Sequence, residues 1–297
     1  MMPDYHIGAL HPDDLAKLGD SDAAMPGMSG PRPVFLQSKA WSKAVLSAKR
    51  RVSADTKIFS FKLDHGEQAV GLPVGQHLMM RLRDPATREA IIRAYTPVSE
   101  HTDRGVLHVL VKIYYGEAGR QGGRMTQALD GLPVGHFVDF KGPVGKFEYL
   151  GGGRCTVSGR ERRVRRFIMV CAGSGITPVF QVLRAVLRDG DDPTICLVLD
   201  GNRAEADILC RDEMDALVAG QEHRCRLLYA LSRPEAHWTG LRGRMDKDLF
   251  EREVGRCRNR ENGGEDLVLV CGPEEMEKSV RTIFGGMGWT DDDLLFF

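Results

Sequence analysis

The sequence lacks a net charge, a long apolar segment and any closely spaced pair of cysteines. Its 297 residues contain 41 Lys and Arg against 41 Asp and Glu, which gives no support for nucleic acid as a partner. No apolar run approaches the roughly 18 residues of a membrane span. Seven cysteines, at positions 155, 171, 196, 210, 225, 257 and 271, form no CxxC pair, so we expect no iron–sulfur cluster and no metal site. Several lie in apolar runs, which is typical of a reducing, cytoplasmic setting.

The first 37 residues are interpreted as a tail and a linker. Gly19 to Pro33 is rich in Gly, Pro, Ser, Asp and Ala and has little apolar surface to bury. Met1 to His6 has the features of neither a signal peptide nor a transit peptide. The residue pattern changes at Ser38, where we expect the first folded domain to begin.

Residues 38–150 contain short apolar stretches separated by turn residues. The stretches lie at 43–50, 58–63, 77–83, 91–96 and 106–115, and several alternate apolar with polar residues. One short helix is predicted at 125–129, followed by two last strands at 137–140 and 147–149. Short strands with regular turns are typical of an antiparallel β-barrel or sandwich, and we expect a barrel domain here.

A second pattern begins after residue 150. Residues 151–166 hold glycines and a basic run, interpreted as a solvated interdomain linker, with a docking patch for an acidic partner as the alternative. From Phe167 to Phe297, strands predicted at 167–171, 194–200, 225–230 and 266–271 alternate with helices at 177–189, 207–219, 246–253 and 274–286. This alternation predicts a doubly wound parallel sheet, so the chain is a β domain followed by an α/β domain.

Two glycine turns follow strands of the predicted parallel sheet. The first is Gly173-Ser174-Gly175-Ile176-Thr177-Pro178 after 167–171, and the second is Cys271-Gly272-Pro273 after 266–270. Strand ends of a parallel sheet meet at one edge, so both turns are expected in one nucleotide pocket. The glycines allow close approach to a pyrophosphate, Thr177 can cap the following helix, and Pro178 suits its first turn. An ordinary strand-to-helix turn is the alternative.

Two stretches of the predicted barrel domain carry groups suited to a nucleotide. Arg93-Ala94-Tyr95-Thr96 ends a strand and presents an arginine, an aromatic ring and a hydroxyl, which we expect to share one face. Gly122-Gly123-Arg124-Met125-Thr126 leads into the short helix and could form a second diphosphate cradle. The alternatives are an exposed strand face and a plain helix N-terminus.

The order of these motifs carries a resemblance to a known family. Arg93-Ala94-Tyr95-Thr96-Pro97, the 122–126 turn, Gly142-Pro143-Val144-Gly145 and the two turns of the α/β domain together resemble the ferredoxin–NADP reductase superfamily, in particular its cytochrome b5 reductase branch. Further details resemble the C-terminal part of fungal assimilatory nitrate reductases: Tyr5-His6-Ile7-Gly8, Gly201-Asn202-Arg203, Asp207-Ile208-Leu209 and Leu295-Phe296-Phe297. The resemblance covers about residues 38–297.

The resemblance implies an FAD-binding barrel at 38–150 and an NADP-binding α/β domain at 167–297. It implies that Arg93 and Ala94 bind FAD, that Tyr95 packs on its ring system, and that Thr96 hydrogen-bonds near the flavin N5. The strand beside the flavin would supply Val111, Lys112, Ile113 and Tyr114, and the diphosphate loop Gly123, Arg124, Met125 and Thr126. Gly173, Ser174, Gly175 and Thr177 would hold the pyrophosphate of the nicotinamide nucleotide or pack against FAD. Cys271 would lie beside the nicotinamide and help to orient it, and Gly272 and Pro273 would also bind the cofactor. Cys271, Thr96 and Tyr95 would be the catalytic residues.

Residues after the third α/β strand bear on the choice of nicotinamide cofactor. An acidic residue at position 232 would repel a 2′-phosphate, but Ser232 is followed by Arg233. A hydroxyl and a guanidinium suit a phosphate through charge-assisted hydrogen bonds. The pair also resembles the Ser-Arg of NADP-selective relatives. We therefore expect NADPH rather than NADH, with Arg203, Arg242 and Arg244 as candidate helpers.

The resemblance also implies partners. Residues 1–37 would hold the end of a cytochrome-b5-type haem domain and a linker, and no haem-binding HPGG or molybdenum-cofactor region is present. The chain would then be the reductase fragment of a homodimeric nitrate reductase that passes electrons to the haem domain of the same polypeptide. A free-standing NAD(P)H:cytochrome b5 reductase and a non-catalytic flavin-binding scaffold remain the alternatives. Neither nucleic acid nor a membrane is an expected partner.

Overall fold

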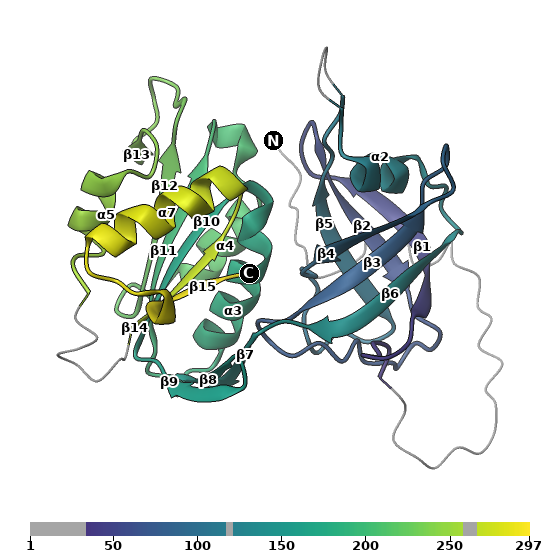
Figure 1. Cartoon of the computed structure of the whole chain (residues 1–297), viewed down its shortest axis with the longest axis horizontal. Helices are drawn as coiled ribbons and strands as arrows, with labels where there is room; N and C mark the ends of the chain where they lie inside the picture. Colours follow the sequence, from purple (N-terminus) through teal and green to yellow (C-terminus); the bar gives the residue numbers. More distant parts are fainter. Residues whose placement is uncertain (1–33, 117–120, 258–265) are drawn as a thin grey trace.

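The computed structural model describes residues 34–116, 121–257 and 266–297. Its first unit, here called the barrel domain, is a six-stranded antiparallel sheet with strand order β4-β3-β6-β1-β2-β5 (Figure 1). The strands are β1 (Ser42–Arg51), β2 (Thr56–Lys62), β3 (His77–Arg83), β4 (Ala90–Tyr95), β5 (Val106–Lys112) and β6 (Phe137–Val144), with helix α2 (Arg124–Gly131) after β5. Along β3 the side chains alternate, and Leu78, Met80 and Leu82 point into the core.

The segment after β4 hydrogen-bonds to β5, so it connects the two edge strands of the sheet. The amide of Val98 donates a hydrogen bond of 2.9 Å to the carbonyl oxygen of His108 in β5. The amide of His108 in turn donates to the hydroxyl of Ser99, at 3.2 Å. The residues that follow the predicted Arg93–Thr96 motif therefore lie against β5, as the barrel prediction requires.

Residues 151–166 are not the solvated loop that we expected. They lie largely in a small antiparallel sheet made of β7 (Phe147–Gly151), β8 (Arg154–Val157) and β9 (Arg160–Arg163). Gly152 and Gly153, both with positive φ, turn the chain between β7 and β8. Arg162 donates to the backbone oxygen of Asp266 at 2.8 Å, so part of the basic run attaches this sheet to the α/β domain.

The second unit, here called the parallel-sheet domain, has the strand order β13-β12-β11-β10-β14-β15, and every neighbouring pair is parallel. The strands are β10 (Arg166–Ala172), β11 (Ile195–Asn202), β12 (Cys225–Leu231), β13 (Leu241–Arg242), β14 (Asp266–Cys271) and β15 (Leu294–Phe296). In β10, Phe167 and Met169 face one core and Ile168 and Val170 face the other, as in a doubly wound sheet.

The helices agree with the predicted positions with one exception. They are η1 (Gly173–Gly175), α3 (Ile176–Arg188), α4 (Arg211–Val218), α5 (Lys247–Glu253) and α7 (Glu274–Gly286), with the short turns η2 (Glu205–Asp207) and η3 (Asp291–Asp293). The single helix predicted at 207–219 is wrong, because Cys210 adopts a left-handed conformation (φ 54°) and separates η2 from α4.

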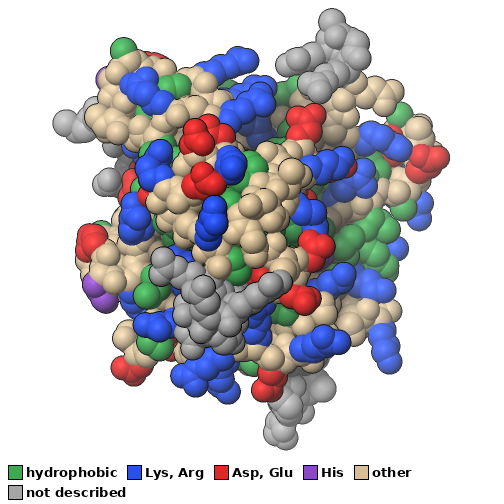
Figure 2. Space-filling model, turned by 60° about the vertical axis from the view of Figure 1, so that its left-hand side comes forward, with side chains coloured by type: hydrophobic (Ala, Val, Ile, Leu, Met, Phe, Trp, Pro, Cys, Tyr) green, Lys and Arg blue, Asp and Glu red, His purple; other side chains and the backbone are tan. Residues whose placement is uncertain are grey.

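Helix α3 runs along the boundary between the two domains (Figure 1). The core under α3 continues into the barrel domain, where it includes Ile58, Val98 and Leu110, and into β7 through Phe147 and Tyr149. On the face shown in Figure 2, side chains of both charge signs are interspersed. None of the helices in the described parts of the chain is long and apolar enough to cross a membrane.

Candidate functional site

The carboxyl edge of the parallel sheet brings the two glycine turns together. Cys171 lies opposite Cys271 in the parallel pairing of β10 and β14. A Cβ atom on Gly175 would lie 2.1 Å from the carbonyl oxygen of Cys271, so only glycine allows this approach. Gly173 has a φ of 54°, which also favours glycine. The two turns therefore meet at one edge of the sheet, as the sequence predicted.

The thiol of Cys271 is half-buried at this edge. Burial, with a smaller contribution from the charge of Glu277, raises the pKa of Cys271 to about 12. The thiol is therefore protonated at neutral pH and can act through its shape and as a weak hydrogen-bond donor, not as a thiolate. Beside it, the amide of Gly272 donates to the carboxylate of Glu277 at 3.2 Å, so this second turn is tied to α7.

The predicted capping role of Thr177 is wrong. Helix α3 begins at Ile176, its N-cap position is Gly175, and no side chain caps it. Because the η1 turn runs directly into α3, the helix starts before Thr177, whose hydroxyl donates to the carbonyl oxygen of Ser174 at 3.1 Å. Thr177 is thus buried beneath the turn and braces it.

Asp200, a buried carboxylate that no sequence motif indicated, lies at the same edge of the parallel sheet, in the same cross-strand row as Cys171 and Cys271. It pairs with Cys171 in the register of β10 and β11 and is 1% exposed. Asn202 Nδ2 donates to it at 2.9 Å, and the Cys171 thiol lies 3.6 Å from its other oxygen. Burial raises the pKa of Asp200 to about 7. The available signal was one acidic residue at the end of an apolar run.

The end of β4 presents part of the predicted flavin-binding motif to solvent. Arg93 and Ala94 are exposed, and the Arg93 guanidinium donates to the carbonyl oxygen of Ile92 at 2.7 Å. Tyr95 packs against the barrel core, and burial raises its pKa to about 12, so its phenol is neutral. Thr96 is buried and lies beyond the last residue of β4. Adjacent residues of a strand point to opposite faces, so Tyr95 and Thr96 do not share one face, and the prediction of a common face for all three groups is wrong.

The end of β5 is joined to the start of α2. The amide of Gly123 donates to the carbonyl oxygen of Tyr114 at 2.8 Å, and the amide of Tyr114 donates to the Thr126 hydroxyl at 3.2 Å. A Cβ atom on Gly123 would lie 2.6 Å from that hydroxyl oxygen, so glycine is required at this junction. Several predicted site residues are core residues here: Val111, Ile113 and Met125 are each at most 2% exposed. They could face a cofactor only through their backbone.

Arg124 is already engaged by two carboxylates. Its guanidinium lies 2.8 Å from Asp84 and 3.0 Å from Glu89, both in the barrel domain. The hydrogen bonds that Arg124 donates to Glu89 and Asp84, in that order of effect, raise the pKa of Arg124 further. This positive charge is therefore neutralised within the barrel domain, and Arg93 is the better placed cation for a pyrophosphate.

The barrel edge and the sheet edge meet. The end of β5 contacts the η1 turn, and Lys112 Nζ lies 3.1 Å from Asp55 in the barrel domain and 3.8 Å from Asp207 in the parallel-sheet domain. Beside this junction, Tyr114 and Tyr115 are each 53% exposed. Exposed tyrosines, an arginine (Arg93) without a carboxylate partner among the described residues, and glycine turns fit a flat ring bearing a diphosphate.

Residues Ser232 and Arg233 lie at the same edge of the sheet, directly after β12. The amide of Arg233 donates to the carbonyl oxygen of Arg203 at 2.7 Å, so two arginines occupy adjacent segments. Both side chains are exposed, and among the described residues neither guanidinium has a hydrogen-bonding or ionic partner. Arg242 does not join them, because it donates to the carbonyl oxygens of Glu235, Ala236 and Trp238 and thereby closes its own loop. Arg244 is exposed.

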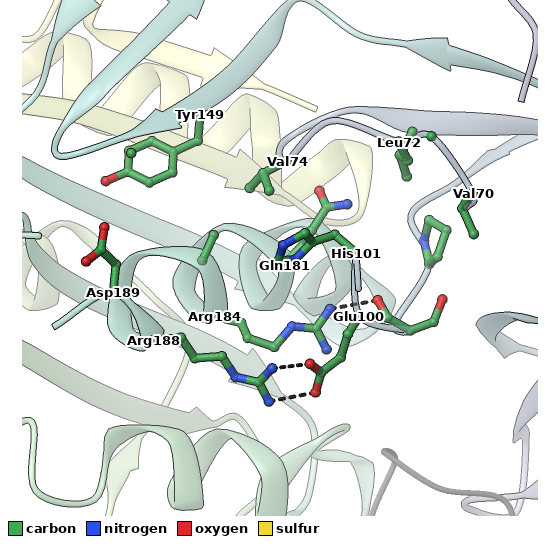
Figure 3. Close-up of a pocket in the computed structure, with 15 residues that line it drawn as sticks. Val70, Leu72, Val74, Glu100, His101, Tyr149, Gln181, Arg184, Arg188 and Asp189 are labelled. Carbon is green, nitrogen blue, oxygen red and sulfur yellow. Dashed lines mark hydrogen bonds and ion pairs between the residues drawn. The ribbon is translucent and has the colours of Figure 1, made fainter. Parts of the chain in front are cut away.

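A cavity of about 360 Å³ lies elsewhere, between the second half of α3 and the barrel domain (Figure 3). Its lining includes Leu72, Pro97, His101, Tyr149 and Arg184, and it contains none of the predicted site residues. The η1 turn and the end of β5, which carry several of the predicted site residues, meet at the opposite end of α3.

Comparisons with known proteins agree with this division. Residues 43–149 match the family of oxidoreductase FAD-binding domains, and residues 169–282 match the family of oxidoreductase NAD-binding domains. The chain is 59% identical over 297 residues to a nitrate reductase [NADPH] of Beauveria bassiana and 58% identical over 304 residues to that of Neurospora crassa. These alignments cover 100% of this chain but 33% and 31% of those two proteins. The chain thus spans about a third of the length of the curated relatives that it matches.

A solved structure covers the same region. The cytochrome b5 reductase domain of Ulva prolifera nitrate reductase is 34% identical and superimposes with a TM-score of 0.81, over 89% of this chain and 100% of that domain. Because this solved domain aligns with both halves of the chain, it supports the order of an antiparallel sheet followed by a parallel sheet. With its FAD-binding and NAD-binding oxidoreductase domains, the chain belongs to the cytochrome b5 reductase domains of nitrate reductases.

Proposed function

We propose that this chain is the reductase part of a nitrate reductase and that it oxidises NADPH. When bound, FAD would accept a hydride from NADPH and release the electrons singly to a cytochrome-b5-type haem domain. The observation that carries this proposal is the contact between the end of β5 and the η1 turn, because it brings the two cofactor edges to one place. A free-standing cytochrome b5 reductase would share this geometry, but the relatives matched over the whole chain are nitrate reductases.

The chain's own residues would bind and orient both cofactors. Arg93 would pair with the FAD pyrophosphate, and Tyr95, held against the barrel core, would support the ring system. Thr96 would offer its hydroxyl near the flavin N5. On the sheet side, the η1 glycines would admit the second pyrophosphate, and the protonated thiol of Cys271 would limit how the nicotinamide lies.

The preference for NADPH follows from the edge after β12. Ser232 and Arg233 would bind the 2′-phosphate, and Arg203 lies on the adjacent segment. Two guanidinium groups without other partners in the described structure suit a dianion. The relatives' names also specify NADPH, and this supports the same choice.

The electron acceptor lies outside the described residues. We propose that it is the haem domain of the same polypeptide, in a cytoplasmic homodimer. The end of the predicted linker at residue 37 is wrong, because Phe35 and Leu36 are buried in the core of the barrel domain and their amides donate to the carbonyl oxygens of Ala69 and Val70. The rest of the predicted linker lies outside the described residues. The reductase part alone would then reduce an artificial acceptor such as ferricyanide and would not reduce nitrate.

The proposal is tested by loading the purified chain with FAD and adding NADPH without oxygen. We expect the flavin absorbance to bleach within seconds and to return when ferricyanide is added. Initial rates with NADH at the same concentration should be lower. A chain that binds FAD without bleaching would be the non-catalytic scaffold, and nitrate reduction by the isolated chain would contradict its role as a fragment.

A further inference from the structure

We infer that Arg184 is a positioning residue for hydride transfer, because it fixes the flavin-binding segment of the barrel domain to the helix that begins at the nicotinamide turn. The inference rests on the proposed function, in which the two cofactor edges face each other. It adds a residue that lies outside both cofactor motifs.

Arg184 belongs to a polar stripe along α3. Thr177, Gln181, Arg184 and Arg188 follow at spacings of four, three and four residues, so they lie on one face of the helix. The stripe starts beneath the η1 turn at Thr177 and points to the barrel domain further along. Gln181 accepts a hydrogen bond of 2.7 Å from the amide of Gly75, and Arg188 is paired with Glu100 (Figure 3).

Arg184 makes the buried contact of this stripe. Its guanidinium donates to the carbonyl oxygen of Val98 at 3.0 Å and to that of Ser99 at 2.7 Å. The residue is 8% exposed, and its guanidinium lies 4.9 Å from the ring centre of Phe180. Hydrogen bonds from a charged, buried donor to two successive carbonyl groups are strong and have a defined direction, because the guanidinium fork is planar.

The two carbonyl groups lie directly after the flavin motif. Val98 follows Thr96 by two residues, and its amide is bonded to His108 of β5. One short segment is therefore held on one side by the barrel and on the other by α3. Any shift of this segment moves Tyr95 and Thr96 relative to the η1 turn, from which α3 starts.

Close packing holds only part of this segment. Val98 is in the core shared with α3 and is 1% exposed, but Pro97, Ser99, Glu100 and His101 line the cavity of about 360 Å³ together with Arg184. Because open space lies beside these residues, the directed hydrogen bonds from Arg184 restrict how the segment can shift toward the cavity. Hydride transfer needs reacting atoms about 3–3.5 Å apart, and a misplacement of about 1 Å can lower the rate about 100-fold.

The experiment compares Arg184→Met with wild type in the FAD-loaded chain. We expect the rate of flavin bleaching by NADPH, expressed per bound FAD, to fall about 30-fold. FAD content, the Kd for NADP+ and the rate of reoxidation by ferricyanide should stay within about threefold of wild type, because Arg184 touches neither cofactor edge. If Arg184 only stabilised the fold, its substitution would lower the FAD content, the affinity for NADP+ and the rates of bleaching and reoxidation together.

Arg188→Gln is the matched control, since it removes a neighbouring exposed ion pair and leaves both carbonyl contacts intact. It should bleach at the wild-type rate. If Arg184→Met fails to fold, Arg184→Lys keeps the charge but loses the fork, and its bleaching rate should fall about fivefold with normal FAD content. Wild-type bleaching in both Arg184 variants would overturn the inference alone, whereas a wild-type chain that NADPH does not bleach would overturn the proposed function.

Discussion

Strand β11 has a buried carboxylate near each end, and the two have opposite surroundings. Asp192, just before the strand, accepts hydrogen bonds from the Tyr149 hydroxyl, from the amides of Gly152 and Thr194, and from the Thr194 hydroxyl. Asp200, near the other end, has the Asn202 amide and the Cys171 thiol. The carboxylate before β11 thus accepts four hydrogen bonds, whereas the carboxylate at the carboxyl edge, where the nucleotide turn lies, has two partners, one of them a weakly donating thiol.

The same contrast runs along α3. Its second half makes interdomain contacts whose donors and acceptors are paired, through Gln181 and Arg184. Its first turn begins at the carboxyl edge of the sheet, where Arg203 and Arg233 follow β11 and β12 and their guanidinium groups have no partner in the described structure. Paired groups stabilise the domain arrangement, and groups left unpaired are available to a ligand.

The largest effect is expected at the amino edge. Asp192→Ala removes the acceptor of four donors, three of them buried, at roughly 1–3 kcal/mol for each group left unsatisfied, although the Tyr149 and Thr194 hydroxyls, 3.4 Å apart, and water can take over some of the bonds. We expect the free energy of unfolding to fall by about 5 kcal/mol in a urea titration. Asp191→Ala, its exposed neighbour, should change stability by less than about 0.5 kcal/mol. Equal effects of the two substitutions would show that Asp192 does not organise this edge.

At the carboxyl edge we expect a dependence on pH. The pKa of Asp200 in the folded protein is about 7, above the ~3.9 of an unfolded chain. The folded state therefore keeps a proton that the unfolded chain loses, and stability falls as the pH rises from about 4 to 7. The loss amounts to about 3–4 kcal/mol. Asp200→Asn should remove this slope in urea titrations at pH 5 and pH 8, and an unchanged slope would assign it to another group.

The unpaired groups after β12 should decide cofactor choice. Ser232→Asp combined with Arg233→Ala puts a negative charge where we place the 2′-phosphate and removes a guanidinium. We expect the ratio of kcat/KM for NADPH to that for NADH to fall about 30-fold. Arg160→Ala, which removes an exposed arginine on β9, should leave the ratio unchanged. A constant ratio in the double variant would place the 2′-phosphate elsewhere.

The smallest effect is expected for the exposed ion pair at the end of α3. The side chain of Arg188 is 54% exposed and that of Glu100 is 25% exposed. A hydrogen bond from Arg188 is the main cause that lowers the pKa of Glu100, but solvent screens such a pair. Glu100→Gln should therefore cost less than about 1 kcal/mol of stability, measured by thermal unfolding at low and high salt. A larger loss would mean that the exposed pair, in addition to Arg184, holds the domains together.

Local patterns predicted most of the elements. Apolar runs and glycine turns placed β10, β14, α3 and α7 within about a residue of their observed bounds. The errors have local physical causes. Cys210 takes a left-handed conformation, which is uncommon for residues other than glycine and is not predicted by a cysteine at this position. The 151–166 stretch is rich in arginine and glycine, yet it pairs as strands because β7 supplies an edge for it.

The sequence by itself determined the two kinds of sheet, the order of the motifs and the family to which they belong, because periodicity and turn chemistry are local properties. Only the tertiary structure decided which motif residues are accessible: Arg93 is exposed, Met125 is in the core, and Arg124 is paired with Asp84. It also revealed Asp200 and Arg184, whose environments are built by residues far away in the chain. Burial and charge pairing depend on such distant neighbours, and no local pattern records them.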